Sequence, residues 1–131
     1  MKQKSVLIVD NNSIVRRSLK VLLSRIKELE FTGEACNGEE AVRMAKALNP
    51  EIILMDINMA PVNGFEATTS ILKENSDIKI VGVSLHEEIA YQKRMKELGA
   101  RGYVSKSSSP DKIIDTILKV ADGETCFPYL N

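Results

Sequence analysis

Short apolar runs alternate with longer amphipathic segments along the whole chain. The apolar runs lie at residues 5–9, 31–36, 52–55, 78–83 and 102–104. Three of them are continuously apolar and rich in Val and Ile, which is typical of parallel strands covered on both faces. The segments between and after them have helical character, as in residues 13–28, where apolar residues recur at helical spacing. The pattern therefore predicts five strands that alternate with five helices.

Capping residues mark several of the predicted helix ends. Asn37 precedes Glu40 by three residues, the spacing of a capping box, and Asn49-Pro50 ends the same helix after about Leu48. Three more residues mark other ends: Gly99 as the C-cap of 87–98, and Ser109 and Pro110 as the N-cap and first residue of the last helix. These signals support the alternation of strands and helices.

Five repeats of strand and helix imply an α/β fold, with one parallel sheet, right-handed crossovers and helices on both faces. The order 2-1-3-4-5 is the common arrangement of such a doubly wound sheet, and its functional crevice lies beside strands one and three. A chain of 131 residues is long enough for a single domain with its own core. Asp10 follows strand one and Asp56 follows strand three, so both carboxylates are expected at the crevice.

Composition excludes several classes of function. Lys and Arg together number 18, as do Asp and Glu, so net charge gives no reason to expect binding to nucleic acid or membranes. Cys36 and Cys126 lack the spacing of a metal or redox site. No apolar segment is long enough for a signal peptide or a membrane span, which predicts a cytoplasmic protein with reduced thiols.

Polar side chains follow four of the five predicted strands. They are Asp10 and Asn11, Asp56, Ser84, and Lys106. Two adjacent carboxylates repel, so they are expected to raise the pKa of one of them or to bind a cation. Oxygen ligands without a nearby His or Cys suit Mg²⁺. Beside a cation and Lys106, an ionised Asp56 would be a nucleophile for a phosphoryl group, and Ser84 would donate a hydrogen bond to the product.

Four motifs at these strand ends resemble one family. They are V-L-I-V-D-N-N, L-M-D-I-N-M with Gly64 eight residues after Asp56, V-G-V-S, and G-A-R-G-Y-V-S-K. In this order they are similar to the receiver domain of bacterial two-component response regulators, over residues 5 to about 123. The resemblance implies a flavodoxin-like fold and transfer of a phosphoryl group from a histidine of a sensor histidine kinase to Asp56. It also implies a receiver domain at 1–123, followed by 124–131 as a tail or the start of a linker to an output domain.

The same resemblance implies a role for each site residue. Mg²⁺ would be held by three side chains and one backbone carbonyl, those of Asp10, Asn11 and Asp56 and that of Asn58. Ser84 and Tyr103 match the switch positions, so phosphorylation would draw in Ser84 and let Tyr103 turn inward. Lys106 matches the phosphate-binding lysine. Such a protein is a phosphoacceptor and not an enzyme, although it can catalyse its own phosphorylation and dephosphorylation.

Three positions depart from the family pattern. Asn11 replaces a second acid, which should weaken Mg²⁺ binding. Ala60 stands where the family has proline, with Pro61 one place later, and Ser107 follows Lys106 where proline is common. A cis peptide bond, typical before that proline, would cost about 3 kcal/mol before serine. The serine run and the end of the last helix look more like the LuxR/NarL class, whose receivers precede a DNA-binding helix-turn-helix, so DNA would be contacted only through a domain outside this chain.

Alternatives stay open for function, for the last helix and for the tail. Asn11 motivates a phosphorylation-independent pseudo-receiver that acts as a module for protein interaction or dimerisation. The apolar stripe of the last helix fits either burial or a homodimer interface. The apolar residues Phe127, Tyr129 and Leu130 either fold back or lead to a further domain. An enzyme on the same fold fits poorly, because the chain has neither a Gly-rich phosphate loop nor a nucleophile–histidine pair.

Two kinds of polar residue are predicted to lie on the surface. His86, the only histidine, is expected in an exposed loop, where its closeness to Ser84 gives it a possible part in dephosphorylation. Arg16 and Arg17 are assigned to the solvated face of the first helix.

Overall fold

The computed structural model describes residues 2–59, 62–85, 89–128 and 130. Within these residues five strands alternate with five helices. The strands are β1 (Lys4–Val9), β2 (Leu29–Ala35), β3 (Ile52–Asp56), β4 (Lys79–Ser84) and β5 (Gly102–Ser105). The helices are α1 (Ser13–Ser24), α2 (Gly38–Leu48), α3 (Gly64–Glu74), α4 (Ile89–Glu97) and α5 (Pro110–Ala121). In the described part of the chain, no helix combines the length and apolar character needed to cross a membrane.

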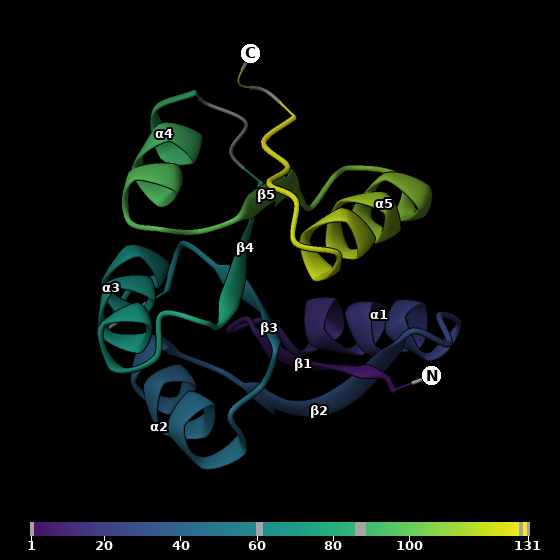
Figure 1. The fold of residues 1–131 in the computed structure, drawn as a ribbon, viewed down its shortest axis with the longest axis horizontal. Coiled ribbons are helices and arrows are strands. Elements are labelled where there is room, and N and C mark those ends of the chain that lie inside the picture. Colours follow the sequence, from purple (N-terminus) through teal and green to yellow (C-terminus); the bar gives the residue numbers. More distant parts are fainter. Residues whose placement is uncertain (1, 60–61, 86–88, 129, 131) are drawn as a thin grey trace.

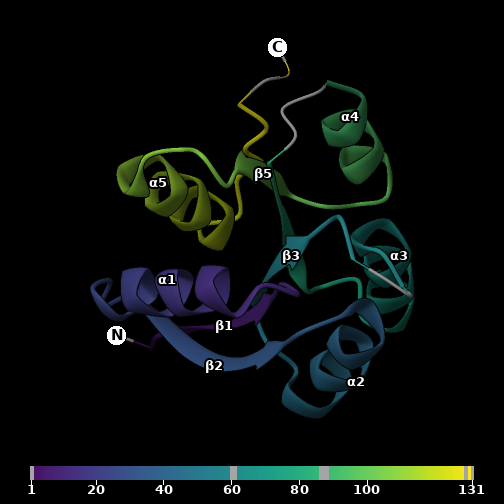
Figure 2. The same ribbon diagram turned by 180° about the vertical axis from the view of Figure 1, so that it is seen from behind.

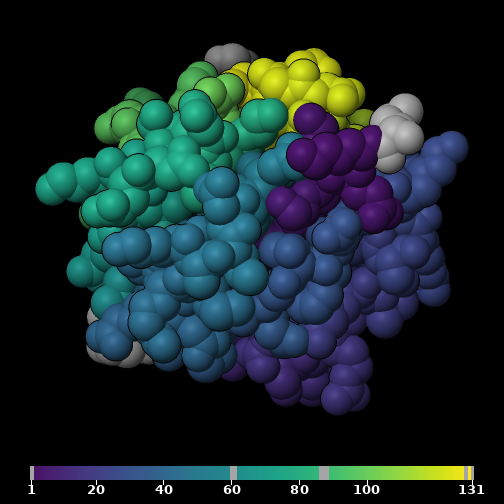
Figure 3. All heavy atoms as spheres, turned by 60° about the horizontal axis from the view of Figure 1, so that its bottom comes forward, coloured from purple at the N-terminus to yellow at the C-terminus, as the bar shows by residue number. Residues whose placement is uncertain are grey.

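The five strands form one parallel sheet in the predicted order β2-β1-β3-β4-β5. Helices α1 and α5 cover one face, and α2, α3 and α4 cover the other (Figures 1 and 2). Figure 3 shows α2 and α3, in blue and teal, side by side on the second face, where they contact each other. The predicted α/β fold is therefore confirmed, and coverage of both faces explains the continuous apolar runs.

Alternate side chains of each strand enter two separate cores. Leu7 and Ile53 are buried beneath α2, α3 and α4, while Val6 and Ile52 are buried beneath α1 and α5. Burial of each large aliphatic side chain contributes about 1.5–3 kcal/mol. The two cores fix the register of the strands, and with it the relative positions of their carboxyl ends.

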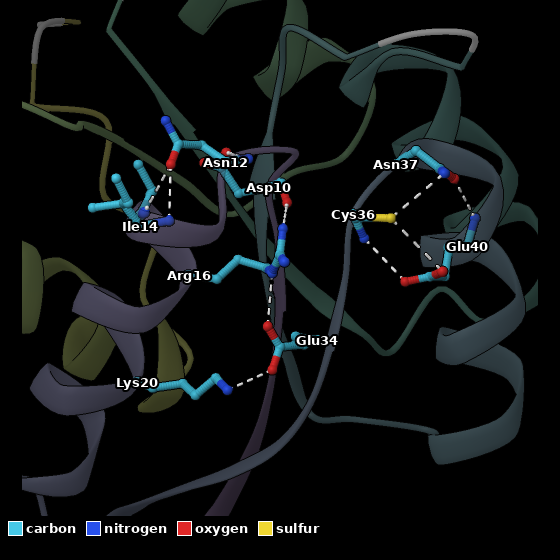
Figure 4. A network of polar contacts seen from close by, with 10 residues as sticks. Asp10, Asn12, Ile14, Arg16, Lys20, Glu34, Cys36, Asn37 and Glu40 are labelled. Atoms are coloured by element: carbon cyan, nitrogen blue, oxygen red, sulfur yellow. Dashed lines mark hydrogen bonds and ion pairs between the residues drawn. The ribbon is translucent and has the colours of Figure 1, made fainter.

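The helix caps agree with the sequence only in part. Ser109 caps α5 by accepting a hydrogen bond from an amide three residues on, and Gly99 follows α4 with φ 106°, as predicted. At α2, the Asn37 side chain accepts from the Glu40 amide, but the Glu40 carboxylate accepts from the Cys36 amide (Figure 4). The predicted capping box is therefore half formed, because the Glu40 side chain reaches one residue farther back.

One helix ends earlier than predicted, and the start of another was not predicted. Helix α1 ends at Ser24 rather than at residue 28, and Ile26 packs against the core from the turn that follows. An apolar residue in such a turn continues the helical spacing without being helical. Helix α3 begins with a complete capping box between Asn63 and Glu66, which was not predicted. The predicted start of α4 at residue 87 lies outside the described residues.

The segment after α5 folds back onto the edge of the sheet. The Cys126 amide donates to the Arg101 carbonyl at 2.9 Å, and the Cys126 carbonyl accepts from the Tyr103 amide at 3.0 Å, which forms a parallel bridge to β5. Phe127 is buried in the core beneath α4, and Leu130 packs against the same core. Phe127 and Leu130 therefore fold back onto the sheet, whereas Tyr129 lies outside the described residues and a further domain stays a prediction.

The apolar stripe of α5 packs against the sheet and α1. Ile113, Ile117 and Val120 are buried, and Ile114 and Leu118 are half-buried against the same core. Among the residues that the structure describes, the exposed large apolar side chains all lie on other segments. Burial therefore accounts for the width of the stripe, and a homodimer interface on α5 stays a prediction.

Candidate functional site

The parallel register aligns the carboxyl ends of β1, β3, β4 and β5 along one edge of the sheet. Four of the predicted site residues lie at these ends: Asp10, Asp56, Ser84 and Lys106. Asp10, Asp56 and Ser84 are only 0, 2 and 1% exposed. These three side chains therefore form a buried polar site at the edge.

Lys106 joins the two carboxylates at this edge. Its Nζ lies 2.7 Å from Asp10 Oδ2 and 3.3 Å from Asp56 Oδ1. Backbone amides hold the same carboxylates: Asn12 N donates to Asp10 Oδ1 at 2.9 Å, and Asn58 N donates to Asp56 Oδ1 at 3.3 Å. The structure thus brings Asp10, Asp56 and Lys106 into direct contact.

Burial raises the pKa of Asp56 above its ordinary value, and the negative charge of Asp10 raises it further. The Lys106 ammonium and the Asn58 amide act in the opposite direction without cancelling the rise. One lysine serves two buried carboxylates, so the site carries an excess of negative charge. A second positive charge at this edge would relieve the repulsion.

The oxygens at this edge fit a hard cation. Asp10 Oδ2 is buried and, within the described residues, forms an ion pair with Lys106 at 2.7 Å and has no further hydrogen-bond donor. In the described part of the chain, no group of three or more His, Cys, Asp or Glu side chains is placed to hold a metal ion. A cation here would therefore depend on two carboxylates, neutral oxygens and water, which is the ligand set that Mg²⁺ accepts.

Serine hydroxyls build the loop that carries Lys106. The Lys106 amide donates to the Ser84 carbonyl at 2.8 Å, which ties this loop to the end of β4. The Ser107 amide donates to Ser105 Oγ at 3.2 Å, and the two hydroxyls lie 2.8 Å apart. A proline at position 107 would lack that amide donor. The departure at Ser107 thus supplies a hydrogen bond that holds the loop.

Tyr103 lies away from this edge, inside the core beneath α4. Its side chain is 0% exposed and packs over Gly82, where an added Cβ would come within 3.0 Å of Tyr103 Cδ2. Met95 of α4 lines the same space. In this structure Tyr103 is already turned inward, and its role as a switch stays a prediction.

Sequence reasoning missed one side chain behind the site. Arg16 was expected to be solvated like Arg17, but its side chain is 17% exposed and bridges two elements (Figure 4). Arg16 Nη1 donates to the Asp10 carbonyl at 2.6 Å, and Nε donates to Glu34 Oε1 at 2.7 Å. Hydrogen bonds from Lys20 and Arg16 hold the pKa of Glu34 below its ordinary value. The prediction for Arg16 was wrong because helical spacing shows only that it lies off the core stripe, not that β2 brings Glu34 beside it.

The other residues that the sequence singled out are either exposed at this edge or lie outside the described residues. Asn11 and Asn58 are exposed at the same edge. Four positions lie outside the described residues: Ala60, Pro61, His86 and Tyr129. The loop path after β3 and any part of His86 in dephosphorylation therefore stay predictions.

Comparison with known proteins agrees with this geometry. The family model of the response regulator receiver domain matches residues 6–118. The chain is 34% identical over 120 residues to the response regulator UvrY of Escherichia coli O6:H1. It is 35% identical over 118 residues to the transcriptional regulatory protein DegU of Brevibacillus brevis. These matches cover 92% and 90% of this chain but 55% and 50% of the relatives, so the chain spans about half their length.

Solved structures show the same fold. A two-component response regulator of the LuxR family from Aurantimonas sp. SI85-9A1 superposes with a TM-score of 0.91 at 29% identity, over 95% of this chain and 89% of that chain. The response regulator domain of Thermotoga maritima CheB superposes with a TM-score of 0.83 at 27% identity, over 93% and 96%. These similarities confirm the flavodoxin-like receiver fold and the expected likeness to the LuxR/NarL class.

Proposed function

Because the chain belongs to the family of response regulator receiver domains, we propose that it accepts a phosphoryl group on Asp56 from a sensor histidine kinase. The contact of one lysine with two buried carboxylates at the ends of β1 and β3 carries this proposal. A carboxylate beside a fixed ammonium is a nucleophile suited to phosphoryl transfer. The role is signalling in the cytoplasm, with a single modification of the protein and no turnover of a small substrate.

The reaction moves one phosphoryl group between two side chains. An oxygen of ionised Asp56 attacks the phosphorus of a phosphohistidine, and the P–O bond forms as the P–N bond breaks. The histidine, protonated on its other ring nitrogen, leaves as neutral imidazole, so charge and atoms balance. Lys106 neutralises charge on the oxygens of the transferred group. Ser84, at the neighbouring strand end, donates a hydrogen bond to the product.

Mg²⁺ is the cation that suits this oxygen set. The groups that would hold it are the side chains of Asp10, Asn11 and Asp56 and the backbone carbonyl of Asn58, with water completing the shell. When bound, Mg²⁺ supplies positive charge that offsets the charge of the phosphoryl group. Asn11 offers a neutral amide oxygen where the family has an acid, so we expect weaker Mg²⁺ binding than in a receiver with two acids.

Phosphorylation would reach an output through α4 and β5. Ser84 is tied through its carbonyl to Lys106, and Tyr103 packs between β5 and α4. A shift of Ser84 toward the phosphoryl group would therefore alter the packing of Tyr103 and the surface of α4, β5 and α5. Because the relatives are about twice as long, we place any DNA-binding output domain outside this chain, after the receiver at 1–123 and the tail 124–131.

Mass spectrometry after incubation with acetyl phosphate and Mg²⁺ tests the proposal. We expect one hydroxylamine-labile phosphoryl adduct in the wild type, formed by the protein's own catalysis. The adduct should be absent from Asp56→Asn and retained in Asp77→Asn, a substitution of an exposed acid. An unmodified wild type, or an adduct that persists in Asp56→Asn, contradicts the assignment.

The alternative is a phosphorylation-independent pseudo-receiver for protein interaction or dimerisation. The neutral side chain of Asn11 favours this alternative, because it should weaken Mg²⁺ binding. The contacts of Lys106 with Asp10 and Asp56 favour the phosphoacceptor. Titration with Mg²⁺ separates the two functions. No binding at millimolar Mg²⁺ together with no adduct would favour the pseudo-receiver, and light scattering would then show whether the chain forms a homodimer.

A further inference from the structure

A salt-bridged arginine lies directly behind the acidic edge of the sheet. Arg16 of α1 donates to the Asp10 carbonyl at 2.6 Å and to Glu34 of β2 at 2.7 Å (Figure 4). Resting on the proposed function, we infer that Arg16 is a positioning residue, which fixes the backbone of Asp10 so that its carboxylate faces the cation and Asp56.

Each polar group of Asp10 is held by a different part of the fold. Its amide donates to the Ala35 carbonyl of β2 at 3.0 Å, and its carbonyl accepts from Arg16 of α1. Its Oδ1 accepts from the Asn12 amide in the turn, and its Oδ2 is paired with Lys106 after β5. Arg16 is thus the link that sets the orientation of the carbonyl, and with it the peptide plane that leads to Asn11.

The Arg16 guanidinium is itself held by its neighbours. Glu34 accepts from Arg16 Nε, and Lys20 pairs with the other oxygen of the same carboxylate at 2.5 Å. The fixed fork of a guanidinium can donate to Glu34 and to the Asp10 carbonyl at once, whereas the single ammonium of a lysine lacks this geometry. Arginine at position 16 is therefore chemically specific.

Positioning and simple electrostatics predict opposite effects when Arg16 is replaced by glutamine. Removing a positive charge behind two carboxylates would strengthen Mg²⁺ binding by Coulomb attraction. Loss of an outer-shell anchor instead weakens metal affinity, typically by about 10- to 100-fold. The sign of the change therefore identifies the role.

Titration of the whole chain with Mg²⁺, followed by amide chemical shifts, supplies the test. We expect Arg16→Gln to weaken Mg²⁺ binding at least about tenfold and to slow phosphorylation by acetyl phosphate. Arg16→Lys should be impaired less than Arg16→Gln, because one donor remains. Arg17→Gln is the matched control, since Arg17 is the exposed neighbour on the same helix.

Hydrogen exchange of the Asn12 amide provides a readout that needs neither Mg²⁺ nor phosphate. Because this amide donates to Asp10 Oδ1, it should exchange faster in Arg16→Gln than in the wild type. In Arg17→Gln its exchange rate should equal that of the wild type. If Arg16→Gln binds Mg²⁺ as tightly as the wild type or more tightly, and its Asn12 amide exchanges at the wild-type rate, the inference is overturned. A wild type that takes no phosphoryl group instead overturns the proposed function, while faster Asn12 exchange would still support positioning. If Arg16→Gln does not fold, Glu34→Gln replaces it, because this variant keeps the guanidinium but removes its charged partner. Faster Asn12 exchange in Glu34→Gln then supports the positioning role, and an unchanged rate overturns it.

Discussion

At the scale of single residues, Asp56 is where stability and chemistry conflict. A nucleophile at neutral pH has to be ionised, yet burial and the charge of Asp10 favour the protonated form of Asp56. Lys106 opposes this preference without removing it. The rest of the domain therefore holds a charge that its surroundings disfavour, which is a common property of functional sites.

Asp56→Asn should stabilise the metal-free domain by about 1 kcal/mol at pH 7. The folded-state pKa of Asp56 lies above the unfolded value, so the folded protein holds this proton more tightly. The ionised carboxylate therefore destabilises the fold at high pH, and the gain from Asn should shrink as pH falls through the folded-state pKa toward the unfolded one. Urea unfolding at pH 7 and pH 4 without divalent cations measures both effects. A wild type as stable as the variant at pH 7 contradicts the prediction, and Asp77→Asn controls for loss of an exposed acid.

Gly64 sets the loop that follows Asp56. A Cβ at this position would lie 2.2 Å from the Asp56 carbonyl oxygen and 2.6 Å from Ile57 Cα, and backbone atoms cannot move aside as a flexible side chain can. Gly64→Ala should therefore lower the free energy of unfolding by about 2–3 kcal/mol and slow phosphorylation. Gly123 is the control, because its φ is 94° but a Cβ added there would meet no atom within 4 Å outside its chain neighbours. Gly123→Ala should therefore lower the free energy of unfolding by only about 1 kcal/mol. A milder effect at Gly64 than at Gly123 would show that the loop relaxes.

The residues of the site differ in how well the sequence predicts them. Asp10, Asp56 and Lys106 were predictable because each lies at a strand end, and parallel topology brings such ends together. The contact between Arg16 and Glu34 was not, because the pairing of β1 with β2 is irregular between Val6 and Leu7. Which face of β2 lies beside Arg16 depends on that irregularity, and hydrophobic spacing does not reveal it.

At the scale of elements, periodic segments were predicted and aperiodic ones were not. Strands β3, β4 and β5 each extend one residue beyond their predicted ends, because Asp56, Ser84 and Ser105 continue the ladder without being apolar. Residues 124–131 have no period, and their polar start gave no sign of direction. The return of Cys126 and Phe127 depends on the free edge of β5 and on the space that Phe127 fills beneath α4, both of which exist only in the folded sheet.

Phe127→Ala should reduce the free energy of unfolding by about 3 kcal/mol. The ring is 9% exposed in the core beneath α4, and Lys96 Nζ lies 5.7 Å from its centroid, so the truncation removes buried area and a cation–π contact. Urea denaturation measures the change. Val21→Ala, at a site that is 49% exposed, should stay within about 0.5 kcal/mol. If Phe127→Ala lowers the free energy of unfolding by less than Val21→Ala does, the tail contributes little to the stability of the domain.

At the scale of the whole molecule, the sheet acts as a frame that joins distant parts of the chain at one edge. Asp10, Asp56 and Lys106 come from three strand ends, and two cores hold those ends in register. Any ligand that relieves the repulsion at the edge binds only the folded chain, so its binding stabilises the entire domain. Mg²⁺ affinity should therefore be readable from global unfolding.

Asn11→Asp should raise Mg²⁺ affinity about tenfold, which at saturating Mg²⁺ adds about 1.4 kcal/mol to the free energy of unfolding. Without Mg²⁺ the third acid should instead lower stability, because it adds a negative charge beside Asp10 and Asp56. The sign of the change in stability should therefore reverse as Mg²⁺ is added, and urea unfolding across a Mg²⁺ series records the reversal.

Asn12→Asp separates coordination from general electrostatics in the same experiment. Asn12 caps α1 by accepting from the Ile14 and Val15 amides, and Asp caps a helix as well as Asn does. The control thus adds the same charge one residue away while keeping the local structure. If both variants gain equally from Mg²⁺, the added charge acts at a distance and position 11 supplies no ligand. A gain confined to Asn11→Asp would identify position 11 as a ligand and attribute the weaker Mg²⁺ binding of the wild type to the missing carboxylate at this position.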